Sequence, residues 1–174
     1  VFTMTGAAVQ NNNAENAGAG MFADSATLYL QGGTIAENDA VGDGGGLRAD
    51  NCTISIDGVT IRANTTQGNG GGVCAGKKSK ITMRSGLITE NTSVVAAGGM
   101  VAQGVGTTLE MTGGAITKNV AETSGGGLYC SRGDFRMSGG EIAGNAASQG
   151  GGVFITTRME MSGGAVRENV AKTD

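Results

Sequence analysis

Residues 125–149 read GGGLYCSRGDFRMSGGEIAGNAASQ, and residues 150–174 read GGGVFITTRMEMSGGAVRENVAKTD. These two stretches are copies of one repeat, and five further copies precede them, the first of which is partial. Each copy carries one asparagine at the same place, with successive gaps of 26, 26, 27, 28, 26 and 24 residues. These anchors are Asn12, Asn38, Asn64, Asn91, Asn119, Asn145 and Asn169. A regular period of this length is typical of a solenoid.

Apolar residues recur at two fixed distances from each asparagine. Eight residues before it stand Met4, Leu30, Ile56, Met83, Met111, Met137 and Met161. Three residues before it stand Val9, Ile35, Ile61, Ile88, Ile116, Ile142 and Val166. Within a copy the local period is two, as in Leu109-Glu110-Met111, and this alternation predicts half-buried strands rather than helices. Paired glycines such as Gly113-Gly114 separate these strands and predict sharp corners.

The pattern predicts an all-β, right-handed parallel β-helix over residues 1–174, with about seven coils of 24–28 residues and three short strands in each. Right-handed winding is expected because parallel strand crossovers have a strong right-handed preference. The alternative is a leucine-rich-repeat horseshoe, whose copies are of similar length. That fold requires a leucine-rich consensus with a helical segment in every copy, and the repeat contains neither.

Equivalent positions of successive coils should stack along the axis. One predicted core column is Phe2, Leu28, Ile54, Ile81, Leu109, Phe135 and Met159. The repeated asparagines are expected to stack as an amide ladder at a corner, because each side-chain amide both donates and accepts hydrogen bonds. Asn64 and Asn91 also begin glycosylation sequons, but as ladder residues they should face inward; the sequon at Asn51 lies in an expected loop.

Composition excludes several classes of protein. The 174 residues include 34 Gly, no Pro, no His and no Trp, with a net charge of −3 that is scattered along the chain. No basic face of the kind that nucleic acids require is visible, and no apolar run approaches the ~20 residues of a membrane span. Glycine does not recur at every third residue, so a collagen-like helix is excluded as well.

The three cysteines, Cys52, Cys74 and Cys130, occupy different positions of the repeat. An odd number cannot form a fully paired disulfide framework. We therefore expect free thiols that act as small apolar fillers, with metal or redox roles as the alternative.

Chemistry-bearing residues are sparse. Asp24 and Asp50 hold equivalent positions on adjacent coils and are the candidates for a cation site or an acid pair, with an ordinary solvated loop as the alternative. Lys77, Lys78 and Lys80 lie in or next to a loop whose length varies between copies, which makes them a candidate anion site. No catalytic residue, cofactor site or metal site is predicted.

An outward column on the strand that follows each glycine cluster is unusually apolar. Its members are Phe22, Arg48, Cys74, Val101, Tyr129 and Phe154. Contiguous exposed apolar surface tends to mark an interface. Phe22, Cys74, Val101, Tyr129 and Phe154 therefore form a candidate lateral contact, with scattered exposed apolar residues as the alternative reading.

The chain resembles the pectin-lyase-like β-helix superfamily and, more narrowly, the repeats of polymorphic outer membrane proteins and autotransporter-type surface proteins. Those arrays carry GGAI and FxxN motifs. Gly126-Gly127-Leu128 stands near the first, while Ile116-Thr117-Lys118-Asn119 and Ile142-Ala143-Gly144-Asn145 stand near the second, with Ile in place of Phe. The resemblance covers nearly the whole chain. It implies a passenger or stalk in adhesion, and also implies polysaccharide-active relatives, none of whose catalytic residues maps onto this sequence.

We therefore expect a non-catalytic, extracellular or cell-surface module, either structural or adhesive. The alternative is a carbohydrate-binding or carbohydrate-cleaving β-helix domain. Partners would be a protein or a glycan at a surface, or other copies through lateral or end-to-end contacts. An ice-binding solenoid is disfavoured, because the outward residues one before each apolar anchor of the third strand do not form a threonine row. Because the first copy begins inside the motif, we expect the chain to be a segment of a longer protein.

Overall fold

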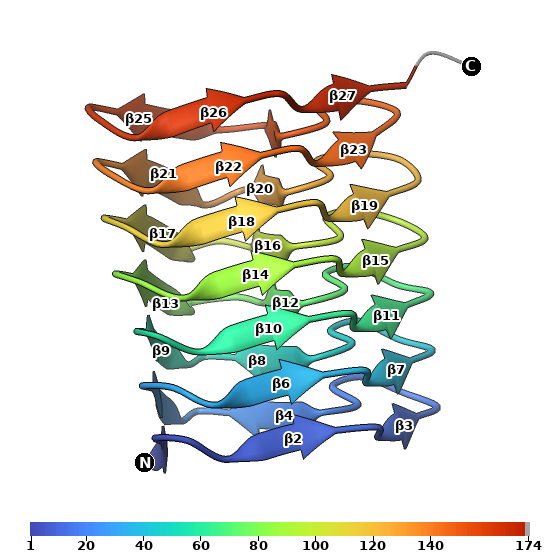
Figure 1. Ribbon diagram of the computed structural model, residues 1–174. Helices are drawn as coiled ribbons and strands as arrows, with labels where there is room; N and C mark the ends of the chain where they lie inside the picture. The colour runs from blue at the N-terminus through green and yellow to red at the C-terminus, as the bar shows by residue number, and fades with distance from the viewer. Residues whose placement is uncertain (173–174) are drawn as a thin grey trace.

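The computed structural model describes residues 1–172 and contains a parallel β-solenoid of seven stacked coils (Figure 1). The front strands in Figure 1 run from left to right and the rear strands return as the chain climbs from the blue to the red end, which is right-handed winding. All strand pairs between coils are parallel and join equivalent positions of neighbouring copies, for example Ile54 with Ile81 and Ile81 with Leu109. The predicted fold class is confirmed.

Four parallel sheets run along the rod, and we call them sheets A to D. Sheet A contains β1 (Phe2–Met4), β5 (Thr27–Leu30), β9 (Thr53–Ile56), β13 (Lys80–Met83), β17 (Thr108–Met111), β21 (Asp134–Met137) and β25 (Arg158–Met161). Sheet B contains β2 (Ala8–Gln10), β6 (Thr34–Ala36), β10 (Thr60–Arg62), β14 (Leu87–Thr89), β18 (Ala115–Thr117), β22 (Glu141–Ala143) and β26 (Ala165–Arg167).

Sheets C and D complete each coil. Sheet C contains β3 (Asn13–Ala14), β7 (Asp39–Ala40), β11 (Thr65–Thr66), β15 (Thr92–Ser93), β19 (Val120–Ala121), β23 (Ala146–Ala147) and β27 (Val170–Ala171). Sheet D contains β4 (Met21–Asp24), β8 (Leu47–Asp50), β12 (Val73–Ala75), β16 (Met100–Gln103), β20 (Leu128–Ser131) and β24 (Val153–Ile155).

The prediction of three strands in each coil is therefore wrong, because the short strands of sheet C form a fourth. Each sheet C strand has only two residues, and its inward side chain is small, such as Ala40, Thr66 or Ser93. Two residues cannot show an alternating pattern, and these small side chains add little to the apolar signal that identified the other strands.

The core consists of the predicted columns. Ile56, Met83 and Met111 are fully buried on sheet A, and Ile61 and Ile88 are fully buried on sheet B. The end coils have a neighbour on one side only, and several of their core-column residues are exposed, namely Phe2, Met159, Met161 and Val166. Each coil therefore depends on the next for buried area and for hydrogen bonds, as in other repeat proteins.

Candidate functional site

The asparagine ladder runs through all seven coils at the corner between sheets B and C. Each asparagine side chain from Asn12 to Asn145 donates from Nδ2 to Oδ1 of the next asparagine along the rod, at 2.8–3.0 Å, and the series ends at Asn169. Asn38, Asn64, Asn91, Asn119 and Asn145 are completely buried. The predicted ladder is confirmed, and the sequon asparagines Asn64 and Asn91 face inward.

Asn91 shows how a ladder residue is satisfied. Its Nδ2 donates to the backbone oxygen of Ile61 at 3.0 Å and to Oδ1 of Asn119 at 2.9 Å. Its Oδ1 accepts from both the backbone N–H and Nδ2 of Asn64, at 3.0 and 2.9 Å. Both amide hydrogens and both acceptor sites of the side chain are used. The ladder is therefore structural, with no group left over for a ligand.

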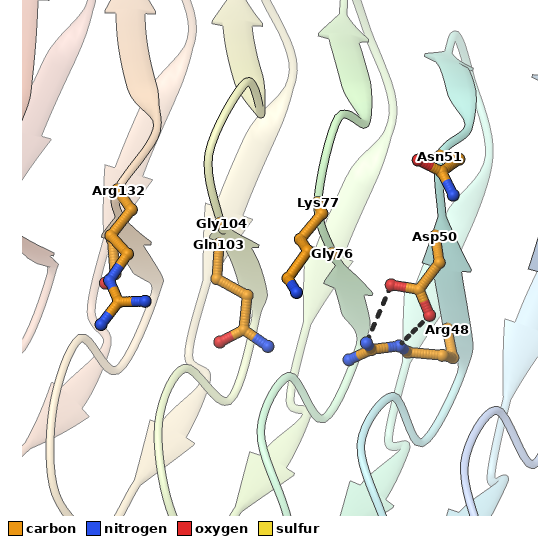
Figure 2. A pocket seen from close by; sticks show the side chains of 9 residues that line it. Arg48, Asp50, Asn51, Gly76, Lys77, Gln103, Gly104 and Arg132 are labelled. Atoms are coloured by element: carbon orange, nitrogen blue, oxygen red, sulfur yellow. Dashed lines mark hydrogen bonds and ion pairs between the residues drawn. The ribbon is translucent and has the colours of Figure 1, made fainter.

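A concavity lies where sheet D ends and the chain turns toward sheet A. We call it the corner groove. It encloses about 540 Å³, within the range of small-molecule sites. Figure 2 shows side chains from four successive coils side by side along it. Its lining consists of Arg48, Asp50, Asn51, Gly76, Lys77, Gln103, Gly104, Ser131 and Arg132.

Two glycines of the corner groove accommodate side chains of the neighbouring coil. A Cβ atom on Gly76 would lie within 2 Å of Oδ1 of Asp50, and one on Gly104 would lie 2.8 Å from Cγ of Lys77. Gly104 also has a φ of +100°, a conformation that other residues rarely adopt. The missing side chains at these two positions leave room for the Asp50 carboxylate and for the stem of Lys77, which line the groove.

One end of the groove is a fixed ion-pair network. Arg48 donates to Asp50 through Nε at 3.0 Å and through Nη2 at 2.8 Å, and donates to Asp43 through Nη1 at 2.8 Å. Asp43 in turn accepts from the backbone and side chain of Asn69 on the next coil. A bidentate arginine–carboxylate pair is geometrically specific. The charge of Arg48 is consequently committed to two carboxylates.

The other cations of the groove are open to solvent. Lys77 and Arg132 are exposed, and neither forms an ion pair with another of the described residues. The lining thus contains three cationic side chains and one carboxylate, whereas the whole chain carries a net charge of −3. Gln103 lies between Lys77 and Arg132 in Figure 2. This end of the groove is a local positive surface on an acidic protein.

Cys74 lies buried beneath Arg48, whose Nη1 is 3.0 Å from the cysteine Sγ. Burial raises the pKa of the Cys74 thiol to about 12, although the nearby guanidinium acts in the opposite direction. Burial likewise raises the pKa of Cys130 to about 11. A thiol with such a pKa is protonated at neutral pH and is a poor nucleophile. Cys52 is also a buried free thiol, as predicted for all three.

The predicted charged candidates are partly separated by the fold. Lys77 lines the corner groove, whereas Lys80 lies on the outer surface of β13 in sheet A. Asp24 and Asp50 are register partners on β4 and β8, as predicted. Asp50 is held by Arg48, while Asp24 accepts a hydrogen bond from Ser25. Within residues 1–172, no group of three or more His, Cys, Asp and Glu side chains converges as a metal site.

The predicted lateral column is not an open stripe. Cys74 and Val101 are completely buried, in a small cluster with Ala97 against which Tyr129 packs. Ala97 lies in the loop before β16, at a position that most coils give to glycine, and belongs to this buried cluster. The expectation of exposure is therefore wrong for Cys74 and Val101. Phe22 remains exposed, and the half-buried rings of Tyr129 and Phe154 stack with centroids 5.5 Å apart.

Sequence reasoning missed Arg48, Gln103, Ser131 and Arg132 as parts of one site. The signal was present in the register. Extending the pairing of sheet D beyond Gln103 and Ser131 brings Asn51, Lys77, Gly104 and Arg132 into one column. Polar and charged side chains that share one column indicate a common surface.

The sequence and the structure were compared with known proteins, and no protein-family model, curated protein or solved structure matches the chain. No helix among residues 1–172 is long and apolar enough to cross a membrane.

Proposed function

We propose that this chain is a non-catalytic structural or adhesive module of a cell surface, which forms a stiff rod and presents a binding surface along one side. The observation that carries this proposal is the unbroken ladder of six amide-to-amide hydrogen bonds through the seven coils. A continuous buried network connects the coils and disfavours bending at any one of them. At about 4.8 Å per coil, the rod extends roughly 34 Å.

The proposal includes kinship with the surface repeats of polymorphic outer membrane proteins and autotransporters. It is supported by the motif positions. Gly126 and Gly127 form the corner before β20, and Asn119 and Asn145 stand on the ladder three residues after inward isoleucines. An extracellular or surface location, with a protein or glycan as partner, follows from this kinship and is part of the proposal.

The second candidate is a carbohydrate-binding or carbohydrate-cleaving domain, and the corner groove favours its binding form. The groove is lined by amide, hydroxyl and charged groups from successive coils. Cleavage of a glycosidic bond commonly uses two carboxyl groups that flank the bond. Asp50 is the carboxylate of the groove lining, and it is already paired with Arg48.

The test has two parts. Antibodies against the solenoid should label intact cells of the source organism. Inert beads coated with purified solenoid should adhere to surfaces that carry cell-surface glycans or proteins. The same glycans, incubated with catalytic amounts of solenoid, should show no new reducing ends. Labelling of permeabilised cells alone would contradict a surface location. Multiple-turnover release of reducing ends would replace the proposal with the enzymatic alternative.

A further inference from the structure

We infer that the corner groove binds a linear acidic glycan, whose carboxylate or sulfate group lies beside Gln103, between Lys77 and Arg132. This inference rests on the proposed adhesive function and names its partner by chemistry. It assigns a ligand site to residues that belong to neither the amide ladder nor the apolar core.

The position of the anion follows from the coil register. Lys77, Gly104 and Arg132 occupy equivalent corner positions on three successive coils, which are spaced about 4.8 Å apart. Lys77 and Arg132 are both exposed, and the Gln103 side chain lies between them in Figure 2. An anion there would contact a lysine from one side and an arginine from the other, which are the two side chains that donate charge-assisted hydrogen bonds to oxyanions.

The ion-pair network sets the orientation of the ligand. Asp50 carries a negative charge at the far end of the groove and would repel a second acidic group there. Its oxygens are already bonded to Arg48, yet each retains a lone pair that can accept from a sugar hydroxyl. The acidic sugar should therefore lie at the Arg132 end, with neutral hydroxyl-bearing units toward Arg48 and Asp50.

The neutral lining residues favour a glycan over other polyanions. Gln103, Ser131 and Asn51 offer amide and hydroxyl groups that match sugar hydroxyls. The groove lining contains no aromatic side chain on which a nucleic-acid base could stack. It also contains no large aliphatic residue that would form an apolar pocket for the anchors of a peptide.

The experiment uses the double variant Lys77→Gln/Arg132→Gln and the matched control Arg84→Gln/Lys118→Gln. Both variants remove two positive charges, but Arg84 and Lys118 are exposed residues outside the groove lining. Binding is measured by calorimetry at low and physiological salt. The probes are a polyuronate oligosaccharide, a sulfated glycosaminoglycan oligosaccharide, neutral dextran and poly-glutamate.

Wild type and the control variant should bind at least one acidic glycan, with the affinity falling as salt rises. The groove variant should bind it about tenfold more weakly, the order expected for two exposed charge pairs. The two acidic glycans distinguish a carboxylate from a sulfate ligand. Equal binding by both variants, or equally tight binding of dextran, would overturn the site. Equally tight poly-glutamate would overturn the glycan assignment.

Folding and adhesion are checked separately. The groove variant should melt within about 2 °C of wild type, because exposed charge changes have small effects on stability. Beads that adhere equally well with wild type and with the groove variant would reject this site while leaving the adhesive function intact. Beads that adhere to no surface component would reject the adhesive function itself.

Discussion

Replacement of Asn91 by Leu should be among the most damaging single substitutions in the rod, because Asn91 lies at the centre of the ladder. Leucine has a similar size but cannot replace the four hydrogen bonds that the side chain makes. The backbone N–H of Asn64, one amide hydrogen of Asn64 and one bond to the carbonyl of Ile61 would lose their partner in a fully buried corner. Each buried orphan costs about 1–3 kcal/mol, so a loss of about 3–9 kcal/mol is expected for the three.

This loss is a large part of the ~5–15 kcal/mol that stabilises a typical domain. It can be measured by urea unfolding followed by circular dichroism, with Asn12→Leu as the control. Asn12 is exposed, and its side chain donates two hydrogen bonds, so its replacement orphans no buried backbone N–H. We expect the control to cost about 0–1 kcal/mol. Equal unfolding midpoints for the two variants would refute the claim that the buried amides stabilise the corner.

Three further predictions concern other parts of the rod. Cys74 should resist thiol reagents at pH 8 in the folded protein and react fully in urea. The pKa of Cys74 in the folded protein, about 12, lies above the usual thiol value, so the free energy of unfolding should decrease as pH rises above about 9. Urea titrations at several pH values should show a smaller decrease for Cys74→Ala than for wild type. Gly71→Ala should cost about 1–3 kcal/mol or more in thermal or urea unfolding, because its Cβ would meet the backbone oxygen of Thr92 at 2.4 Å, whereas Gly6→Ala has open space and should be neutral. The double variant Tyr129→Ser/Phe154→Ser should remove any lateral self-association seen by sedimentation. It should also lower the free energy of unfolding by about 1–3 kcal/mol, because the ring stack and apolar burial are lost. Unchanged association would argue against this face as a contact.

The ladder and the core columns could be predicted from sequence because their spacing along the chain is regular. Met111, Ile116 and Asn119 stand at the same offsets in their copy as Met83, Ile88 and Asn91 do in theirs, and each set stacks on the other in the structure. Stacking of equivalent positions is what a parallel coil requires. A period in sequence therefore becomes a column in space.

The parts that could not be predicted depend on loops rather than on strands. Val101 belongs to an outward strand position, yet it is buried in a cluster with Ala97 of the loop before β16. The register places Lys77 and Arg132 in one column, but it does not show that Asp50 and Lys77 pack over Gly76 and Gly104 or that a groove lies beside them. Alternation and spacing describe which residues are present, but they do not show how a loop folds over its neighbours.

The central claim is that a continuous buried amide ladder makes this chain a stiff rod. The most direct test is the hydrogen-exchange rate of each asparagine side-chain amide, measured by NMR on protein labelled with ¹⁵N. The exposed amide of Asn51 provides an internal reference in the same spectrum. The buried ladder residues are Asn38, Asn64, Asn91, Asn119 and Asn145. We predict that their side-chain amides exchange several orders of magnitude more slowly than that of Asn51, because they exchange only when the corner opens. Exchange at the rate of Asn51 along the ladder would contradict the account.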